Sequence, residues 1–177
     1  MIVGLILAGG LSSRMGADKA SLIIEGRTLL QRTATALRAV GATIVAVSGD
    51  RPGGIPDRWP RSGPVGGIAS AVEYLPDGEL LVVPVDMPRL NQSVLEPLIA
   101  ARSERTTLWH GYPLPMRMTL DGASRTALAE LMTQPGRTCS VSALQSRLGA
   151  ARLAIDTLDT RLLVNCNTPD EWREANA

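Results

Sequence analysis

Residues 2–20 of the sequence read IVGLILAGGLSSRMGADKA. The apolar run Ile2–Leu7 ends in an Ala-Gly-Gly stretch, a pattern typical of a buried strand that feeds a loop. Glycines let backbone N–H groups approach an anion closely, and Arg14 and Lys19 add positive charge over the same few residues. The loop lacks the Gly-Lys-Ser/Thr ending of a Walker A motif and the spacing of a Rossmann fingerprint. A flexible turn with two solvated cations is the alternative, but this order of residues after a strand favours a loop that binds a nucleoside triphosphate.

The composition excludes several classes of protein. A length of 177 residues suits one domain with a sizeable core, and a net charge of +1 offers no electrostatic case for nucleic acid or a membrane surface. Aromatic residues are only 3%, which argues against stacking platforms for single-stranded nucleic acid. Cys139 and Cys166 have no metal-type spacing, and a single His excludes a His-rich metal site. Without a run of transmembrane length or a signal-peptide pattern, we expect a cytoplasmic protein.

Apolar runs alternate with helical patterns over the first hundred residues. We expect strands at Ile2–Leu7, Thr43–Ser48 and Leu80–Val85, and helices at Thr28–Val40, Gly66–Leu75 and Ser93–Ser103, the last capped by Ser93. Further along, we expect strands at Thr106–Gly111, Leu114–Leu120, Arg152–Thr157 and Leu162–Val164, and helices at Ser124–Met132, Thr138–Leu148 and from Thr168. This alternation predicts an α/β fold whose parallel, doubly wound sheet carries helices on both faces. Since ligands bind outside the carboxyl ends of such strands, the loops after Leu7, Ser48 and Val85 should share one edge.

Asp86 follows the point where the third apolar run stops, at the predicted ligand edge. A carboxylate there suits Mg²⁺, which proteins hold with one or two carboxylates plus substrate phosphates and waters. The alternative is an aspartate that caps a helix or closes a turn. A phosphate loop at the same edge favours the metal role.

Two further segments carry weaker signals. The glycines of Gly63–Gly67 either allow tight packing of a loop on a helix or let a helix N-terminus face an anion or a base, and the residues alone leave both open. Asn165 and Asn167 are two residues apart on an extended segment, so they point to the same face and can contact a polar ligand.

These four segments, in this order, resemble the MobA family, the molybdenum cofactor guanylyltransferases. The resemblance spans nearly the whole chain, from Leu7 to Trp172. Gly9-Gly10 resembles the guanylyl-transferring branch, whereas the cytidylyl-transferring branch usually has Ala-Gly there. Sugar-phosphate nucleotidyltransferases usually have Gly-Thr-Arg where this chain has Ser-Ser-Arg. The resemblance implies a three-layer α/β/α sandwich with a Rossmann-like, mostly parallel sheet of the nucleotidyltransferase type.

The resemblance also implies roles for single residues. Catalytic roles fall to Arg14, Lys19 and Asp86, and Asp86 would hold Mg²⁺. The residues expected to bind the nucleotide are Leu7, Ala8, Gly9, Gly10, Lys19, Ser48, Asp57, Gly66 and Asp86. The residues expected to bind the acceptor are Pro115, Arg137, Asn165 and Asn167. Two matches depart from the family pattern: Ser48 stands where many members have Asn, and Asp57 is one residue closer to the Gly-Pro pair than usual.

The implied reaction transfers GMP from GTP to the terminal phosphate of molybdenum-molybdopterin and releases pyrophosphate. The nucleophile is already an anionic phosphate, so catalysis reduces to alignment and charge neutralisation. The implied partners are GTP, molybdenum-molybdopterin, and molybdoenzyme apoproteins or their chaperones. Residues 1–105 would form the nucleotide-binding half and residues 106–177 the acceptor-binding half of one domain. The alternatives are a related transferase that uses CTP or acts on a sugar or cobinamide phosphate, and a nucleotide-binding module without turnover.

Overall fold

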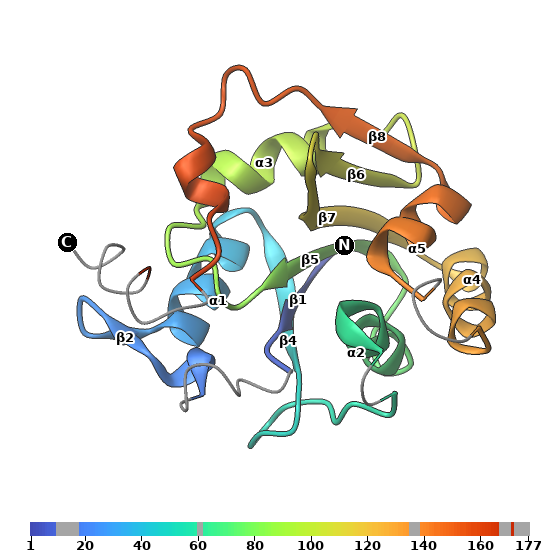
Figure 1. Ribbon diagram of the computed structural model, residues 1–177, viewed down its shortest axis with the longest axis horizontal. Coiled ribbons are helices and arrows are strands. Elements are labelled where there is room, and N and C mark those ends of the chain that lie inside the picture. The colour runs from blue at the N-terminus through green and yellow to red at the C-terminus, as the bar shows by residue number, and fades with distance from the viewer. Residues whose placement is uncertain (10–17, 60–61, 135–138, 167–170, 172–177) are drawn as a thin grey trace.

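The fold is built on one six-stranded mixed sheet with the strand order β4-β1-β5-β7-β6-β8 (Figure 1). The computed structural model describes residues 1–9, 18–59, 62–134, 139–166 and 171. The strands are β1 (Ile2–Leu7), β4 (Ala42–Ser48), β5 (Gly78–Pro84), β6 (Thr106–Trp109), β7 (Tyr112–Leu120) and β8 (Ala150–Leu153). The β4-β1, β1-β5 and β6-β8 pairs are parallel, whereas β7 runs antiparallel to both β5 and β6. The sheet is therefore mostly parallel, as expected, and it joins strands from both halves of the chain.

Helices cover both faces of this sheet. One face carries α1 (Leu29–Ala39) and α3 (Gln92–Ala100), and the other carries α2 (Gly63–Val72), α4 (Gly122–Met132) and α5 (Val141–Leu148) (Figure 1). The central strand β5 shows why both faces are covered, because its fully buried residues alternate between the two cores. Leu80 and Val82 pack with α2, whereas Leu81 and Val83 pack with α1 and α3. The expected three-layer α/β/α sandwich is confirmed.

Local signals place most helix ends. Thr28 caps α1 through a capping box with Gln31, and Gly41 just beyond the helix has a φ of 89°. The expected cap of α3 was wrong, because the side chain of Asn91, not Ser93, accepts the N-terminal hydrogen bond. Pro84 ends β5, as its missing N–H suggests.

Other boundaries differ more. The expected strand at Leu162–Val164 is wrong, because this segment lies in and beside a 3-10 turn, η3 (Thr160–Leu163), capped by Asp159. The helix expected from Gly66 begins three residues earlier and ends at Val72. A hairpin of two short strands, β2 (Ile23–Ile24) and β3 (Arg27–Thr28), was not expected from the sequence. The helix expected from Thr168 lies outside the described residues. Within the described part of the chain, no helix is both long and apolar enough to cross a bilayer.

Candidate active site

Three strands deliver their carboxyl ends to one edge of the sheet. Leu7 at the end of β1 is in register with Ser48 of β4 and with Pro84 of β5. Beyond the strands, the Ala8 N–H donates to the Ser48 carbonyl at 2.9 Å and the Val85 N–H donates to the Leu7 carbonyl at 3.1 Å. The expectation that these three loops share one edge is therefore confirmed. Because the sheet occupies the Ala8 N–H, a nucleotide would have to use other backbone groups of this loop.

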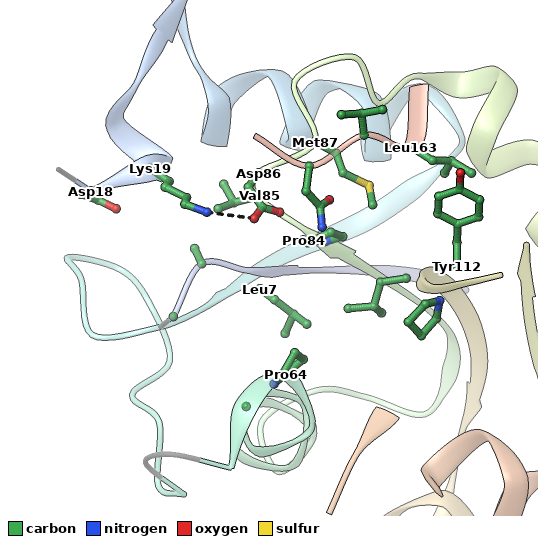
Figure 2. Close-up of a pocket in the computed structure, with 17 residues that line it drawn as sticks. Leu7, Asp18, Lys19, Pro64, Pro84, Val85, Asp86, Met87, Tyr112 and Leu163 are labelled. Carbon is green, nitrogen blue, oxygen red and sulfur yellow. Dashed lines mark hydrogen bonds and ion pairs between the residues drawn. The ribbon is translucent and has the colours of Figure 1, made fainter. Parts of the chain in front are cut away.

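A pocket of about 700 Å³ opens at this edge (Figure 2). Its walls come from the loops after β1 and β5, the start of α2, the start of β7 and the segment after η3. The lining residues are Leu7, Ala8, Gly9, Asp18, Lys19, Gly63, Pro64, Pro84, Val85, Asp86, Met87, Tyr112, Pro113, Leu114, Leu163, Val164 and Asn165. Charged side chains gather at one end, and apolar side chains line the other (Figure 2). This volume lies in the range of small-molecule and cofactor sites.

Lys19 and Asp86 form the charged end of the pocket. Lys19 opens the 3-10 turn η1 (Lys19–Ser21), and its Nζ lies 3.2 Å from Asp86 Oδ2 (Figure 2). The two side chains are 20% and 18% exposed, so the pair is partly screened from solvent. Asp86 Oδ1 is buried and has no hydrogen-bond partner among the described residues. A cation and a carboxylate with an unused oxygen therefore face the same cavity.

That unused oxygen bears on the expected metal. The described residues contain no group of three or more His, Cys, Asp or Glu side chains that could hold a metal ion by themselves. Mg²⁺ suits a different arrangement, since it typically binds one or two carboxylates together with substrate phosphates and waters. Asp86, with its buried unpaired Oδ1, fits such a site as a single protein ligand.

Asp18 holds the turn that carries Lys19. Its side chain accepts hydrogen bonds from the Ala20 N–H at 3.2 Å and the Ser21 hydroxyl at 2.7 Å, and it forms an ion pair with Arg51 at 2.6 Å. Burial raises the pKa of Asp18, but the hydrogen bonds from Ser21 and Arg51 and the Arg51 charge outweigh it, so the pKa lies below its usual value. Arg51 was not expected at the site from the sequence, because nothing local connects it to Asp18, 33 positions earlier.

Gly49 is a second residue that the sequence analysis missed. Its φ is 137°, and an added Cβ would lie 2.9 Å from the Gly9 nitrogen and 3.0 Å from the Ala8 carbonyl carbon. The loop after β4 thus packs directly on the start of the nucleotide loop. A glycine immediately after a predicted strand was the available signal.

Ser48, Asp57 and Gly66 do not line the pocket. Ser48 is 2% exposed, and its hydroxyl faces Gly67 on α2, where an added Cβ would approach within 2.7 Å. The carboxylate of Asp57 accepts hydrogen bonds from the Trp59 N–H at 2.9 Å and the Ser70 hydroxyl at 3.3 Å. Of the two interpretations left open for the glycines, close packing fits Gly66, because its Cβ would lie 2.8 Å from the Trp59 carbonyl. Nucleotide contacts by these three residues stay predictions.

The expected acceptor residues are only partly brought to the pocket. Asn165 lines it, whereas Pro115 is buried just beyond the lining residues of β7. The pocket also uses Tyr112 and Leu163, which the sequence analysis did not single out. The backbone N–H of Cys166 donates to the Asp86 carbonyl at 2.8 Å and so ties this segment to Asp86. Four expected site residues lie outside the described residues, namely Gly10, Arg14, Arg137 and Asn167.

Burial also affects the cysteine in this segment. Cys166 is 4% exposed, and burial raises the pKa of its thiol, with the charges of Glu171 and Asp86 acting in the same direction. Its thiol is therefore expected to stay protonated at neutral pH, which fits a small packing residue.

Comparisons with known proteins agree with this geometry. The MobA-like NTP transferase domain matches residues 4–150. A molybdenum cofactor guanylyltransferase from Xanthomonas euvesicatoria pv. vesicatoria is 44% identical over 172 residues, which cover 96% of this chain and 91% of that protein.

Solved structures share the fold at low sequence identity. Molybdopterin-guanine dinucleotide biosynthesis protein A from Archaeoglobus fulgidus superposes with a TM-score of 0.68 at 20% identity, over 99% of this chain and 97% of that chain. The 2-C-methyl-D-erythritol 4-phosphate cytidylyltransferase from Thermus thermophilus has a TM-score of 0.69 at 18% identity, over 99% and 98%. These structures support the fold alone. The domain match over most of the chain and the close full-length relative show that this chain belongs to the MobA-like NTP transferase family.

Proposed function

We propose that this protein transfers GMP from GTP to the terminal phosphate of molybdenum-molybdopterin, forming the guanine dinucleotide cofactor and releasing pyrophosphate. The observation that carries the proposal is the Lys19–Asp86 pair at 3.2 Å in the pocket at the carboxyl edge of the sheet. The named activity of the 44% identical relative supports the choice of guanylyl transfer. As part of the same proposal, the reaction takes place in the cytoplasm, and molybdoenzyme apoproteins or their chaperones receive the product.

The transfer is a displacement at phosphorus. An oxygen of the acceptor phosphate forms a bond to the α-phosphorus of GTP, and the bond from that phosphorus to the bridging oxygen breaks. The electron pair leaves with pyrophosphate. Lys19 would neutralise phosphate charge during this step, and Asp86 would keep its partner cation in place. When bound through Asp86, Mg²⁺ would supply further charge neutralisation at the phosphates.

The two ends of the pocket suit the two substrates. The charged end formed by Asp18, Lys19 and Asp86 suits the triphosphate, whereas Tyr112 and Leu163 give the other end an apolar surface for a planar ring system. Asn165 also lines the pocket, next to the backbone hydrogen bond from Cys166 to Asp86, and can donate or accept hydrogen bonds. An acceptor seated at the apolar end would approach the nucleotide from the side opposite the β1 loop.

A comparison of nucleotide substrates tests the proposal. Purified protein is incubated with molybdenum-molybdopterin, Mg²⁺ and either GTP, CTP or ATP, while pyrophosphate release is followed and the dinucleotide is identified by mass spectrometry. We expect product with GTP and little with the others. A preference for CTP would contradict guanylyl transfer, and GTP binding without pyrophosphate release would favour a module without turnover.

A substitution links this reaction to the pocket. Lys19→Ala should lower the turnover number roughly 10²–10³-fold, the usual loss when one strong electrostatic stabiliser is removed. Arg147→Met is the matched control, because Arg147 pairs with Glu130 at 3.0 Å on the α4–α5 surface, away from the pocket. Normal turnover by the Lys19 variant would show that the reaction uses another site.

Removal of metal tests the role given to Asp86. Treatment with a chelator should abolish pyrophosphate release, and added Mg²⁺ should restore it. Full activity in the presence of excess chelator would contradict the metal proposal.

A further inference from the structure

Asp18 lies in the wall of the pocket that we assign to the triphosphate. Its carboxylate is needed locally, because it caps the turn that presents Lys19 and accepts hydrogen bonds from Ala20 and Ser21. The same carboxylate carries a negative charge towards a cavity meant for a polyanion. Without a neutralising partner, this carboxylate would repel the phosphates.

Arg51 neutralises this carboxylate from outside the pocket. Its Nη2 lies 2.6 Å from Asp18 Oδ1. The Arg51 side chain is 14% exposed and the Asp18 side chain 47% exposed, so solvent screens the carboxylate in part and the guanidinium much less. Arg51 itself does not line the pocket. It therefore acts on any ligand there through Asp18, not by direct contact.

The loop after β4 is shaped to hold Arg51 in this place. The Arg51 carbonyl accepts a hydrogen bond from the Gly54 N–H at 2.9 Å. An added Cβ at Gly54 would lie 2.7 Å from Arg51 Cγ and 2.4 Å from the Gly49 carbonyl oxygen, so only glycine leaves room for the arginine stem. Arg51 Nη2 donates to Asp18, whereas the buried Nε has no hydrogen-bond partner in the described structure.

We propose that Arg51 is a positioning residue for the nucleotide triphosphate, which acts by neutralising Asp18 and so removes an uncompensated negative charge from the wall of the triphosphate pocket. This inference rests on the proposed function only for the identity of the nucleotide. The competing explanation is that the Arg51–Asp18 pair merely tethers two loops.

The chain offers a matched pair for comparison. Asp121 caps α4 as Asp18 caps η1, and it pairs with Arg105 at 2.5 Å. The Arg105–Asp121 pair lies near the opposite edge of the sheet and does not line the pocket. Arg105→Met therefore removes an arginine from a capping aspartate without changing the charge at the pocket.

A double-mutant cycle at positions 18 and 51 tests the inference. Binding of GTP, GDP and GMP in the presence of Mg²⁺ is measured by calorimetry for the wild type, Arg51→Met, Asp18→Asn, the double variant and Arg105→Met. Asparagine at position 18 keeps the capping oxygen but removes the charge. Thermal melting of each variant verifies that it is folded.

The expected results follow from charge. Arg51→Met should weaken GTP binding roughly tenfold, with a smaller loss for GDP and the smallest for GMP, because the repulsion grows with phosphate charge. The double variant should bind GTP within about twofold of the wild type, since the uncompensated charge is gone. In turnover assays, Arg51→Met should raise the KM for GTP while kcat changes little, the pattern of lost uniform binding. Arg105→Met should bind GTP like the wild type.

Three results would overturn the inference. GTP binding by Arg51→Met equal to that of the wild type would show that neutralisation of Asp18 has no role. A double variant as weak as Arg51→Met would show a loop tether instead of screening. Loss of GTP binding in Asp18→Asn alone would show that the carboxylate itself is required. Failure of the proposed function would be seen separately. Absent pyrophosphate release or a preference for CTP would overturn guanylyl transfer. The same set of variants, measured with the preferred triphosphate, would still decide the role of Arg51.

Discussion

Two ion pairs lie at opposite ends of β5 and differ in what surrounds them. Asp86 follows the carboxyl end of the strand and pairs with Lys19 at 3.2 Å, whereas Glu79 near the amino end pairs with Arg117 at 3.3 Å. Arg117 is only 1% exposed, and its two Nη groups donate to the carbonyls of Ala101, Glu104 and Arg105 and to the Thr119 hydroxyl. Burial lowers the pKa of Arg117, although the Glu79 charge opposes this.

The difference shows how similar pairs serve different purposes. Both Nη groups of Arg117 donate to the backbone between α3 and β6, whereas its Nε has no partner in the described structure, so the Nη groups hold the amino edge of the sheet together. Glu79 Oε2 and Asp86 Oδ1 are both buried oxygens without a hydrogen-bond partner in the described structure. Glu79 Oε2 lies 3.3 Å from the buried Arg117 Nη1, whereas Asp86 faces a pocket of about 700 Å³. An unsatisfied buried carboxylate oxygen is costly, and the pocket in front of Asp86 has room for a ligand that would complete it. We therefore expect substitutions at the carboxyl edge to change activity and those at the amino edge to change stability.

The largest expected effect is on turnover at the carboxyl edge. Asp86→Asn keeps the shape of the side chain but removes its charge, so guanylyl transfer should fall roughly 10²–10³-fold while the melting temperature stays near that of the wild type. Pyrophosphate release and thermal melting measure the two effects. Glu79→Gln is the control at the other end of β5 and should keep its turnover number. A loss of activity in Glu79→Gln equal to that in Asp86→Asn would remove the distinction between the two pairs.

At the amino edge, Arg117→Met should cost about 3 kcal/mol of unfolding free energy, because it leaves carbonyls and the Glu79 carboxylate without their buried partner. Chemical denaturation measures this loss, and turnover per folded molecule should remain normal. Adding Glu79→Gln should recover part of the stability, since the unpaired charge is removed. If Arg117→Met instead abolishes turnover in folded protein, the amino edge also serves the reaction.

A smaller effect is expected where the loop after β4 touches the nucleotide loop. Gly49→Ala adds a Cβ at a φ of 137° and within 2.9 Å of the Gly9 nitrogen, so it should cost about 1–3 kcal/mol of stability and weaken GTP binding. Gly53→Ala in the same loop is the control, because its φ is 73° but no atom lies within 4 Å of the added Cβ. Denaturation and calorimetry compare the two variants. Equal GTP affinity would show that the Gly49 contact does not shape the site.

The smallest effect concerns acid stability at the amino edge. The hydrogen bond from Arg105, with that from the Ser124 backbone, lowers the pKa of Asp121 below its usual value. A lowered folded-state pKa stabilises the fold above the unfolded-state value of about 4 and loses this contribution as pH falls through the folded pKa. Asp121→Asn should therefore have a lower melting temperature than the wild type near neutral pH, and this difference in melting temperature should vanish below about pH 4. A difference that is independent of pH would contradict this account, and turnover should not change.

Much of the fold could be predicted from short stretches of sequence. The strands β1, β4 and β5 were expected within two residues of their observed bounds, and the capping box at Thr28 fixes the start of α1. The sequence also predicted that the loops carrying Lys19 and Asp86 share one edge, because parallel strands bring their carboxyl ends together, whereas the ion pair between these two side chains was not expected. The Leu162–Val164 segment was misjudged because three apolar residues carry too little periodicity to separate a strand from a 3-10 turn.

Other features depended on the tertiary structure alone. The reversal of β7, the contact of Gly49 with Gly9 and the pairing of Arg51 with Asp18 each join segments that are distant in sequence. Similarly, Asp57 had a plausible role as a nucleotide ligand, yet its carboxylate bonds to Trp59 and Ser70. No local pattern or motif specifies which distant segments of the chain come into contact.

The sequence by itself determined the strand that carries the nucleotide loop, the positions of Lys19 and Asp86 after their strands, and the family to which these segments belong. Those properties depend on hydrophobic periodicity and on residues within a few positions of one another. Only the tertiary structure decided which oxygen of Asp86 stays unpaired, which arginine neutralises Asp18 and which apolar side chains face the charged end of the pocket. These depend on the register and packing of the whole sheet, because a side chain's partner is set by where distant backbone segments come together.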